Sequence, residues 1–335
     1  MFLRDAVALA APAIVWCCII AIVVTIFCCP LWIPVLLGGL LALINSHYEC
    51  YAYKGLFRTN GEDTVQPLSV VSYNVNLAYS DLSTQEKAEN IADYLLEKDT
   101  DIILLQEYNP QLFPALQQKL VKKYQYGSPY HLADRYKAVF SKYPISDYIQ
   151  LKEYSTRGDG VIGDEDRRYL PICCMTVAVN GNPLYMVNCH LHSNNFSPAL
   201  RQLRLNEISL VSFIKKIFCS LLQGIEERKK QVKTLRNHLS GCSQPIIICG
   251  DMNDVSGSSA MRMLRGKDLF DAWWTKGIGL GFTLSMKAMR WRLDHILYSK
   301  DIKIESVMVD KYDMSDHRPL LCKFYLNPYI HESSI

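Results

Sequence analysis

Several signatures of common enzyme and scaffold classes are missing from this 335-residue sequence. It contains no CxxC pair, so its 12 cysteines form neither a zinc-binding pattern nor a disulfide framework. It has no GxSxG motif, no internal repeat and no extended low-complexity tract. A formal net charge of +3 is too small to indicate a nucleic-acid partner by itself. What is left is an ordinary globular composition, with 49% hydrophobic and 21% charged residues.

Charged side chains are absent from residue 6 to residue 44, a run about twice the roughly 20 apolar residues that a membrane span needs. Pro30 and Pro34 disfavour one continuous helix, so the run predicts two spans, Ala6–Phe27 and Leu31–Tyr48. One long tilted span, a signal peptide and a buried soluble helix are the alternatives. A signal peptide has a shorter apolar core, and so long an apolar run is costly to keep in water.

The composition changes after this run, and the change divides the chain. We expect an N-terminal transmembrane helical hairpin at 1–48, a polar linker at 49–65, a catalytic-type domain at 66–328 and a tail at 329–335. A domain of about 260 residues suits a single α/β unit. A few positive charges flank the apolar run on both sides, and positive charge favours the cytoplasmic side of a membrane. We therefore expect both flanks to lie in the cytoplasm. These features predict an integral membrane protein whose catalytic-type domain lies in the cytoplasm.

Strand-like runs dominate the domain, and helical segments lie between them. A helix is predicted over 82–99, because Ser83 and Glu86 have capping-box spacing before an amphipathic pattern. A second, basic helical stretch starts at Pro198, and we expect Gly224 to break it in two. Its charges predict a solvated face, with anionic lipid or nucleic acid as alternative contacts. Many strands with interspersed helices predict two packed sheets with helices outside.

Polar side chains recur where apolar strands end. Each has an ordinary explanation when taken alone, such as a turn, a strand end or a local salt bridge. A rigid sheet can, however, present strand-end side chains to a cleft, and all of these residues can bind a metal or handle a proton. Their combination therefore predicts a catalytic rim. The residues are Asn74, Glu107, His190, Asp251, Asn253, Asp294, Asp316 and His317.

The motifs SYN, LQE, NCH, GDMN, RLDH and SDH, in this order, resemble the endonuclease/exonuclease/phosphatase superfamily over about residues 68–324. The resemblance implies a four-layered α/β sandwich, in which two mixed β-sheets are flanked by helices, and a metal-dependent phosphoric ester hydrolase. The stretches HLHSNN and RLDHI are similar to the bacterial and tyrosyl-DNA phosphodiesterase-like branches rather than to inositol phosphatases. A membrane-anchored, bacterial-type member is thus expected.

The resemblance also implies a metal site. It makes Glu107 the principal ligand, with Asn74 and Asp316 beside it, for a Mg²⁺ ion that Mn²⁺ could replace. Hard divalent cations prefer oxygen ligands of this kind. A further residue that contacts phosphate is expected in the middle of the domain, and either Tyr136 or Arg168 is a candidate.

The remaining site residues are implied to act on the substrate. Asp251 would orient or deprotonate the attacking water, and Asn253 would bind the phosphoryl group. His190 and His317 would contact the phosphate. Asp294 would fix the tautomer and the charge of His317.

The substrate and one alternative function stay open at this level. A nucleic acid would use the basic segment 228–236, whereas a phospholipid headgroup would explain the membrane tether. No protein partner is implied. The alternative is a catalytically silent, membrane-anchored binding or scaffold module of the same fold. The presence of every expected residue type favours the enzyme.

Overall fold

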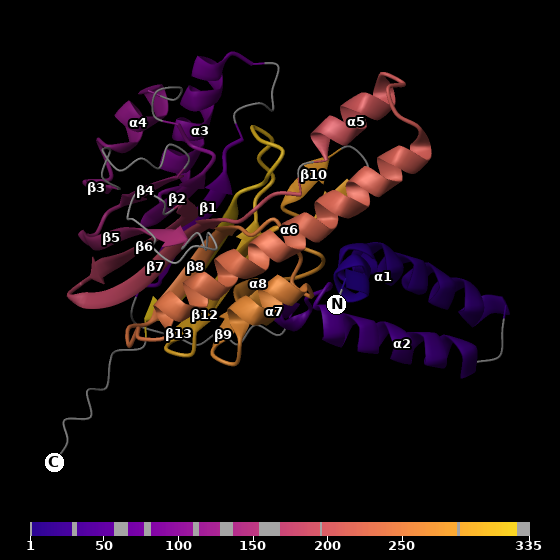
Figure 1. The fold of residues 1–335 in the computed structure, drawn as a ribbon. Helices are drawn as coiled ribbons and strands as arrows, with labels where there is room; N and C mark the ends of the chain where they lie inside the picture. Colours follow the sequence, from indigo (N-terminus) through magenta and orange to yellow (C-terminus); the bar gives the residue numbers. More distant parts are fainter. Residues whose placement is uncertain are drawn as a thin grey trace, which may run out of the picture.

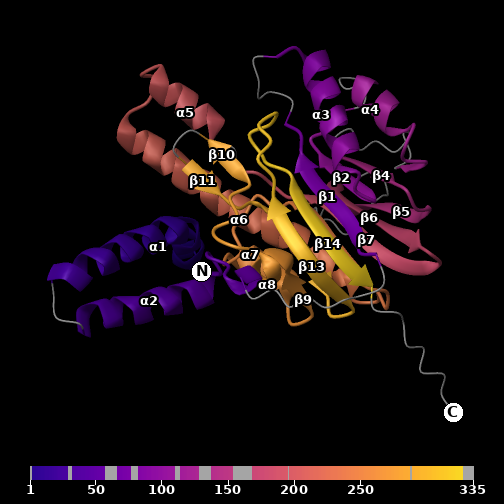
Figure 2. The same cartoon turned by 180° about the vertical axis from the view of Figure 1, so that it is seen from behind.

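Apolar runs rich in β-branched residues form two mixed six-stranded sheets that lie face to face, with helices on their outer faces (Figures 1 and 2). This confirms the predicted α/β architecture of two mixed sheets flanked by helices. The computed structural model describes residues 2–28, 32–56, 66–76, 82–109, 114–127, 137–153, 168–194, 196–286 and 289–326.

The first sheet has the strand order β13-β14-β1-β2-β4-β3. Strands β1 and β2 are parallel, and their neighbours in the sheet are antiparallel. The carboxyl ends of β1 and β2 therefore meet at one edge. The bounds are β1 Leu68–Asn74, β2 Ile102–Gln106, β3 Tyr126–Gly127, β4 Lys137–Ser141, β13 Ile302–Val309 and β14 Leu320–Leu326.

The second sheet has the order β5-β6-β7-β8-β12-β9, with β7 and β8 as its parallel pair. A separate two-stranded ribbon, β10-β11, lies beside the sandwich. The bounds are β5 Ile145–Glu153, β6 Arg168–Val179, β7 Asn182–His190, β8 Ile246–Asp251, β9 Leu269–Asp271, β10 Leu284–Met286, β11 Met289–Trp291 and β12 Asp294–Ser299.

Within the described part of the chain, three apolar cores hold the layers together. Alternation along β1 shows how: Val70 faces the core between the sheets, whereas Val71 and Tyr73 face the outer core beneath α3 and α4. Helices α6 and α7 cover the outer face of the second sheet. The helices outside the N-terminal region are η1 Lys54–Leu56, α3 Thr84–Lys98, α4 Pro114–Leu120, α5 Ser197–Arg204, α6 Leu210–Leu239, α7 Ser259–Arg265 and α8 Ala272–Lys276.

Two helix predictions have different outcomes. The capping box of α3 is confirmed, because Ser83 Oγ accepts from Glu86 N and Glu86 Oε2 accepts from Ser83 N. The expected break at Gly224 is wrong, since α6 runs unbroken from residue 210 to 239. Gly224 is needed for a tertiary reason: a Cβ there would collide with Asn194 Oδ1.

The N-terminal apolar run forms two helices, α1 (Phe2–Cys28) and α2 (Trp32–Tyr48), which pack against each other (Figure 1). Among the described residues, one helical segment is long and apolar enough to cross a membrane: Asp5–Ile26, 22 residues with mean hydropathy 2.8. Helix α2 has 17 residues and falls short of that length. One predicted span thus meets the requirement, and the transmembrane hairpin is not confirmed.

These helices are fastened to the sandwich. The buried Asp5 carboxylate accepts hydrogen bonds from the N–H and the hydroxyl of Ser259, at the start of α7, at 2.6 and 2.9 Å. Arg265 pairs with Glu49, and Ala52 exchanges two backbone hydrogen bonds with Gly279. Residues 49–56 of the predicted linker are therefore attached to the sheet domain. Residues 57–65 and the predicted tail at 329–335 lie outside the described residues.

Gly250 at the end of β8 generates the first prediction. Its φ is +142°, and a Cβ would collide with the carbonyl oxygen of Cys189 on the neighbouring strand. We expect Gly250→Ala to lower the free energy of unfolding by about 1–3 kcal/mol or more, because both the backbone and the strand contact would be strained. Urea unfolding followed by tryptophan fluorescence measures this.

Gly241→Ala is the matched control, since a Cβ at Gly241 has no neighbour within 4 Å. Equal stabilities of the two variants would contradict the close approach of β7 and β8 at Gly250.

Candidate active site

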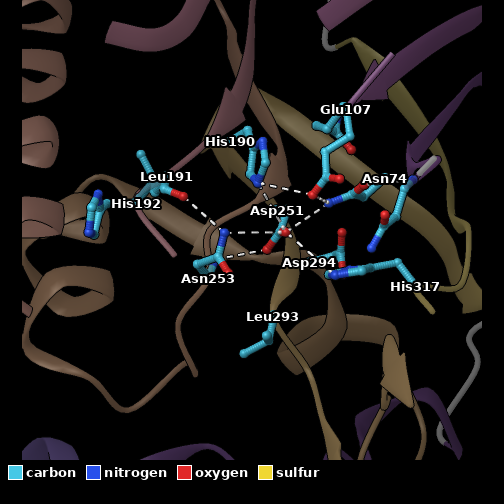
Figure 3. Close-up of polar contacts among 12 residues, drawn as sticks. Asn74, Glu107, His190, Leu191, His192, Asp251, Asn253, Leu293, Asp294 and His317 are labelled. Atoms are coloured by element: carbon cyan, nitrogen blue, oxygen red, sulfur yellow. Dashed lines mark hydrogen bonds and ion pairs between the residues drawn. The ribbon is translucent and has the colours of Figure 1, made fainter. Parts of the chain in front are cut away.

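Strand ends from both sheets converge at one edge of the sandwich (Figure 3). Asn74 ends β1, and Glu107 directly follows β2, its parallel partner. His190 and Asp251 end the parallel strands β7 and β8, and they face each other in register. Strand β12 runs the other way, so its first residue, Asp294, pairs with Asp251. Topology alone thus gathers five polar residues far apart in sequence.

Asp251 lies at the centre of the group and is 1% exposed. Its carboxylate accepts from Asn74 Nδ2 at 3.0 Å and from the backbone N–H of Asn253 at 2.8 Å. Nε2 of His190 and Nε2 of His317 each lie 3.6 Å from its Oδ2. Burial raises the pKa of the Asp251 carboxyl, although the nearby His317 lowers it. A buried carboxylate with a raised pKa is suited to accept a proton.

His317 is held by a second buried carboxylate. Its Nδ1 lies 2.7 Å from Asp294 Oδ2, and both residues are buried. Burial alone would lower the pKa of the His317 imidazole, but the carboxylates of Asp294 and Asp251 outweigh it and raise the pKa to about 10. Burial likewise would raise the pKa of Asp294, yet His317 lowers it. His317 is therefore a cation at neutral pH, with Nε2 directed toward Asp251.

The expected metal ligands occupy the first-sheet side of the group. Glu107 adopts a positive φ of 54°, and its Oε1 accepts from Asn74 Nδ2 at 3.0 Å. Asp316 Oδ1 accepts from Asn76 Nδ2 at 2.9 Å. Ser315 holds that loop on β1 through a 2.8 Å hydrogen bond to the carbonyl of Asn74. The carboxylate oxygens of Glu107 and Asp316 are suited to a hard divalent cation.

Asn74 bridges two carboxylates of the group. Its amide nitrogen donates to two carboxylates, and its Oδ1 accepts from the backbone N–H of Asn76 at 3.1 Å. It thus orients Glu107 and Asp251 relative to each other. Among the described residues, the group whose ligand-type atoms lie within 4.8 Å of one another is Asp251, Asp294 and His317, where the His317–Asp294 hydrogen bond favours proton handling.

Sequence reasoning missed Lys87. This buried lysine of α3 donates to the carbonyl of Asn76, and burial lowers its pKa while Asp316 and Glu107 raise it. Its ammonium thus adds positive charge beside both expected metal ligands. The signal in the sequence was a lysine at helical spacing with the apolar Ile91.

Other candidates lie elsewhere. His192 shares the HLH stretch with His190 but lies apart from Asp251 (Figure 3). His295 binds the carbonyl of Asp254 at 2.9 Å and belongs to a separate buried network. Tyr136 and the side chain of Arg168 lie outside the described residues.

Comparison with known proteins identifies the family of the chain. A family model described as "Endonuclease/Exonuclease/phosphatase family" matches residues 71–317. No curated protein sequence matches the chain.

Solved structures share the fold at low sequence identity. A humanized D. rerio TDP2 has a TM-score of 0.55 and 18% identity, covering 77% of this chain and 99% of that one. The human Nocturnin catalytic domain has a TM-score of 0.52 and 17% identity, covering 78% and 96%. Beta toxin 275-280 from Staphylococcus aureus has a TM-score of 0.51 and 18% identity, covering 77% and 99%.

The charged state of His317 generates a prediction on stability. The folded-state pKa of about 10 lies above the ordinary histidine value of 6.5. The stabilisation is therefore complete below about pH 6.5 and is lost as pH rises toward 10, because the folded protein holds a proton that the unfolded chain releases. In EDTA, we expect the free energy of unfolding to fall across this window.

His317→Gln should flatten that part of the pH–stability curve, since glutamine has no proton to release. His238→Gln, a change at a half-buried histidine on α6, serves as the control and should keep the slope. An unchanged slope in His317→Gln would contradict the charged pair.

Proposed function

Because the chain belongs to the endonuclease/exonuclease/phosphatase family, we propose that it is a Mg²⁺-dependent, membrane-tethered hydrolase of phosphoester bonds. Phosphoester hydrolysis is the general chemistry of this family, whose members typically use a divalent metal ion. The observation that carries the proposal is the buried His317–Asp294 pair beside Asp251, at one end of both sheets. A scaffold module needs no such arrangement of charge.

Glu107 and Asp316 would hold Mg²⁺, or Mn²⁺ in its place, and Asn74 would keep Glu107 in position. The bound ion would neutralise developing charge on the phosphoryl oxygens. The residues fit this group because both offer carboxylate oxygens and both come from the first sheet, Glu107 directly after β2 and Asp316 between β13 and β14. Lys87 would limit the repulsion between the two carboxylates.

The chain's own residues then handle the proton and the substrate charge. Asp251 takes a proton from water as the water oxygen bonds to phosphorus, and the leaving oxygen departs on the opposite side with the bonding electrons. The cationic His317 and the nearby His190 stabilise negative charge on the phosphoryl group. Asn253 orients Asp251 through its backbone N–H and contacts the phosphoryl group beside it.

The substrate is a phosphoester of a nucleic acid or of a phospholipid headgroup. The fold neighbour D. rerio TDP2 has been solved with a single-strand DNA product, which supports the first class. The apolar Asp5–Ile26 segment supports the second, because it would keep the site near headgroups. A panel of abasic duplex, single-stranded DNA, phosphotyrosyl-DNA, sphingomyelin and phosphoinositides separates these classes.

Asp251 and His317 are the substitutions that test the chemistry. With bis-p-nitrophenyl phosphate and Mg²⁺, we expect Asp251→Asn and His317→Ala each to lower turnover roughly a hundredfold or more, as loss of a general base or an electrostatic group does. Asp93→Asn, at an exposed surface ion pair, is the control and should keep the parent rate. Near-parent rates in both site variants would remove these assignments.

Removal of the metal tests the other half of the site. We expect EDTA to abolish turnover and added Mg²⁺ or Mn²⁺ to restore it. Glu107→Gln should raise the Mg²⁺ concentration needed for half-maximal rate, because a carboxylate ligand is lost, whereas Glu305→Gln on β13 should not. Absence of metal-dependent turnover on every substrate would favour the catalytically silent binding module.

The membrane tether has its own test. We expect the full chain to stay in the membrane pellet after alkaline carbonate extraction. Deleting residues 2–44 should release a domain that keeps the Ala52–Gly279 attachment and its turnover, although the Asp5 contact is lost. A full chain that carbonate extracts, or a truncated chain that stays in the pellet, would contradict anchoring by α1.

A further inference from the structure

One half of α6 extends beyond the sandwich. Toward its C-terminus this 30-residue helix is buried against the second sheet through Val232, Leu235 and Leu239. Toward its N-terminus large apolar side chains are exposed instead, with Val211 at 77% and Leu210 at 62%. We call this exposed set, together with Leu205 at the end of α5, the overhang stripe: Leu205, Leu210, Val211, Ile214, Phe218 and Leu222.

Helical geometry shows that the two halves present one continuous face. Leu210, Ile214, Phe218 and Leu222 follow each other in steps of four residues, and each step turns the helix by only about 40°. Ile225 lies three residues further on, within the same face, and it is buried. The face that packs against the sheet therefore continues past the sheet as an exposed apolar stripe, which is the pattern of a helix that binds another apolar surface.

The charge around the stripe is mainly positive. Residues 197–222 contain Arg201, Arg204, Lys215 and Lys216, and Glu207 is the one acidic residue among them. All five residues are exposed. Apolar side chains bordered by lysine and arginine are typical of helices that lie at the surface of an anionic bilayer.

The position of the stripe agrees with a bilayer. In both views, α5 and the N-terminal half of α6 project from the sheets on the same side as α1 and α2 (Figures 1 and 2). Helix α1 is fastened to the domain through Asp5, and Trp291 Nε1 also donates to the carbonyl of Leu9 at 3.3 Å. A bilayer crossed by α1 would therefore lie next to the side of the domain that carries the stripe.

We propose that the overhang stripe lies in the interfacial layer of the anionic bilayer that α1 crosses, as a second attachment of the domain. This rests on the membrane anchor in the proposed function, but not on catalysis. A bilayer is favoured over a protein partner because this chain itself carries the span and the basic border. Arg228 of α6 donates to Asn194 Oδ1 and to the carbonyl of His192, close in sequence to His190 of the site. Attachment of α6 to the bilayer would therefore also fix the orientation of the site relative to the headgroups.

Tryptophan scanning tests the contact in the full chain. The protein is reconstituted in vesicles of phosphatidylcholine and phosphatidylglycerol, with or without brominated phosphatidylcholine. For Val211→Trp and Ile214→Trp, the measured quantity is the tryptophan fluorescence in excess of that of the parent chain. We expect brominated lipid to quench most of this excess, because the new tryptophan would contact the bilayer. Lys233→Trp, at an exposed position of the buried half of α6, is the matched control and should keep its added fluorescence. Circular dichroism confirms that each variant is folded.

The outcomes separate the two proposals. If carbonate leaves the chain in the membrane but the fluorescence added by Val211→Trp and Ile214→Trp is no more quenched than that of the control, the stripe proposal is overturned and the anchor stands. If carbonate extracts the chain, both fail, whatever the phosphodiesterase assay shows. Concentration-dependent cross-linking through the stripe, together with loss of quenching, would assign it to a second copy of the chain and likewise overturn the bilayer contact.

Discussion

The burial of one carboxylate at the junction of two sheets is the constraint on which this structure depends. Asp251 is enclosed at the end of β8, and a buried charge is tolerated only when hydrogen bonds and opposite charge surround it. Asn74 supplies a hydrogen bond from the first sheet, and His317 supplies the charge. The register of both parallel strand pairs therefore determines whether the Asp251 carboxylate finds its hydrogen-bond and charge partners.

The loops around this edge serve the same requirement. The segments that carry Asp294 and His317 are held next to each other by Thr283. Its hydroxyl accepts a hydrogen bond from the backbone N–H of Asp294, and its carbonyl accepts one from the backbone N–H of Arg318. A bridge between Leu284 and His317 extends that contact. The β10-β11 ribbon, which lies outside the main sheets, thus has a structural reason to exist: it braces the histidine loop.

Sequence patterns predicted the strands and the polar residues at their ends, because alternation and strand termini are local features. The same patterns could not predict features that depend on contacts between segments distant in the sequence. Gly224 looked like a helix breaker, but the reason for it is the neighbouring Asn194. Sequence reasoning did not single out Lys87, whose buried ammonium donates to the carbonyl of Asn76 and feels the charges of Asp316 and Glu107. The pairing of His317 with Asp294 came only through family resemblance, since no local pattern joins residues 23 positions apart.

The attachment of the N-terminal helices bears on which substrates the site can reach. A domain hung on a flexible linker samples a wide volume, whereas here Asp5, Glu49 and Ala52 fasten the helices directly to α7 and to the segment before β10. Such a domain would hold its site at a fixed height above a bilayer. A phosphoester carried by the bilayer would then meet the site at a high effective concentration, while a soluble one would gain nothing from the tether. Under the proposed anchoring by α1, rigid fastening would thus favour substrates held at the membrane over soluble ones.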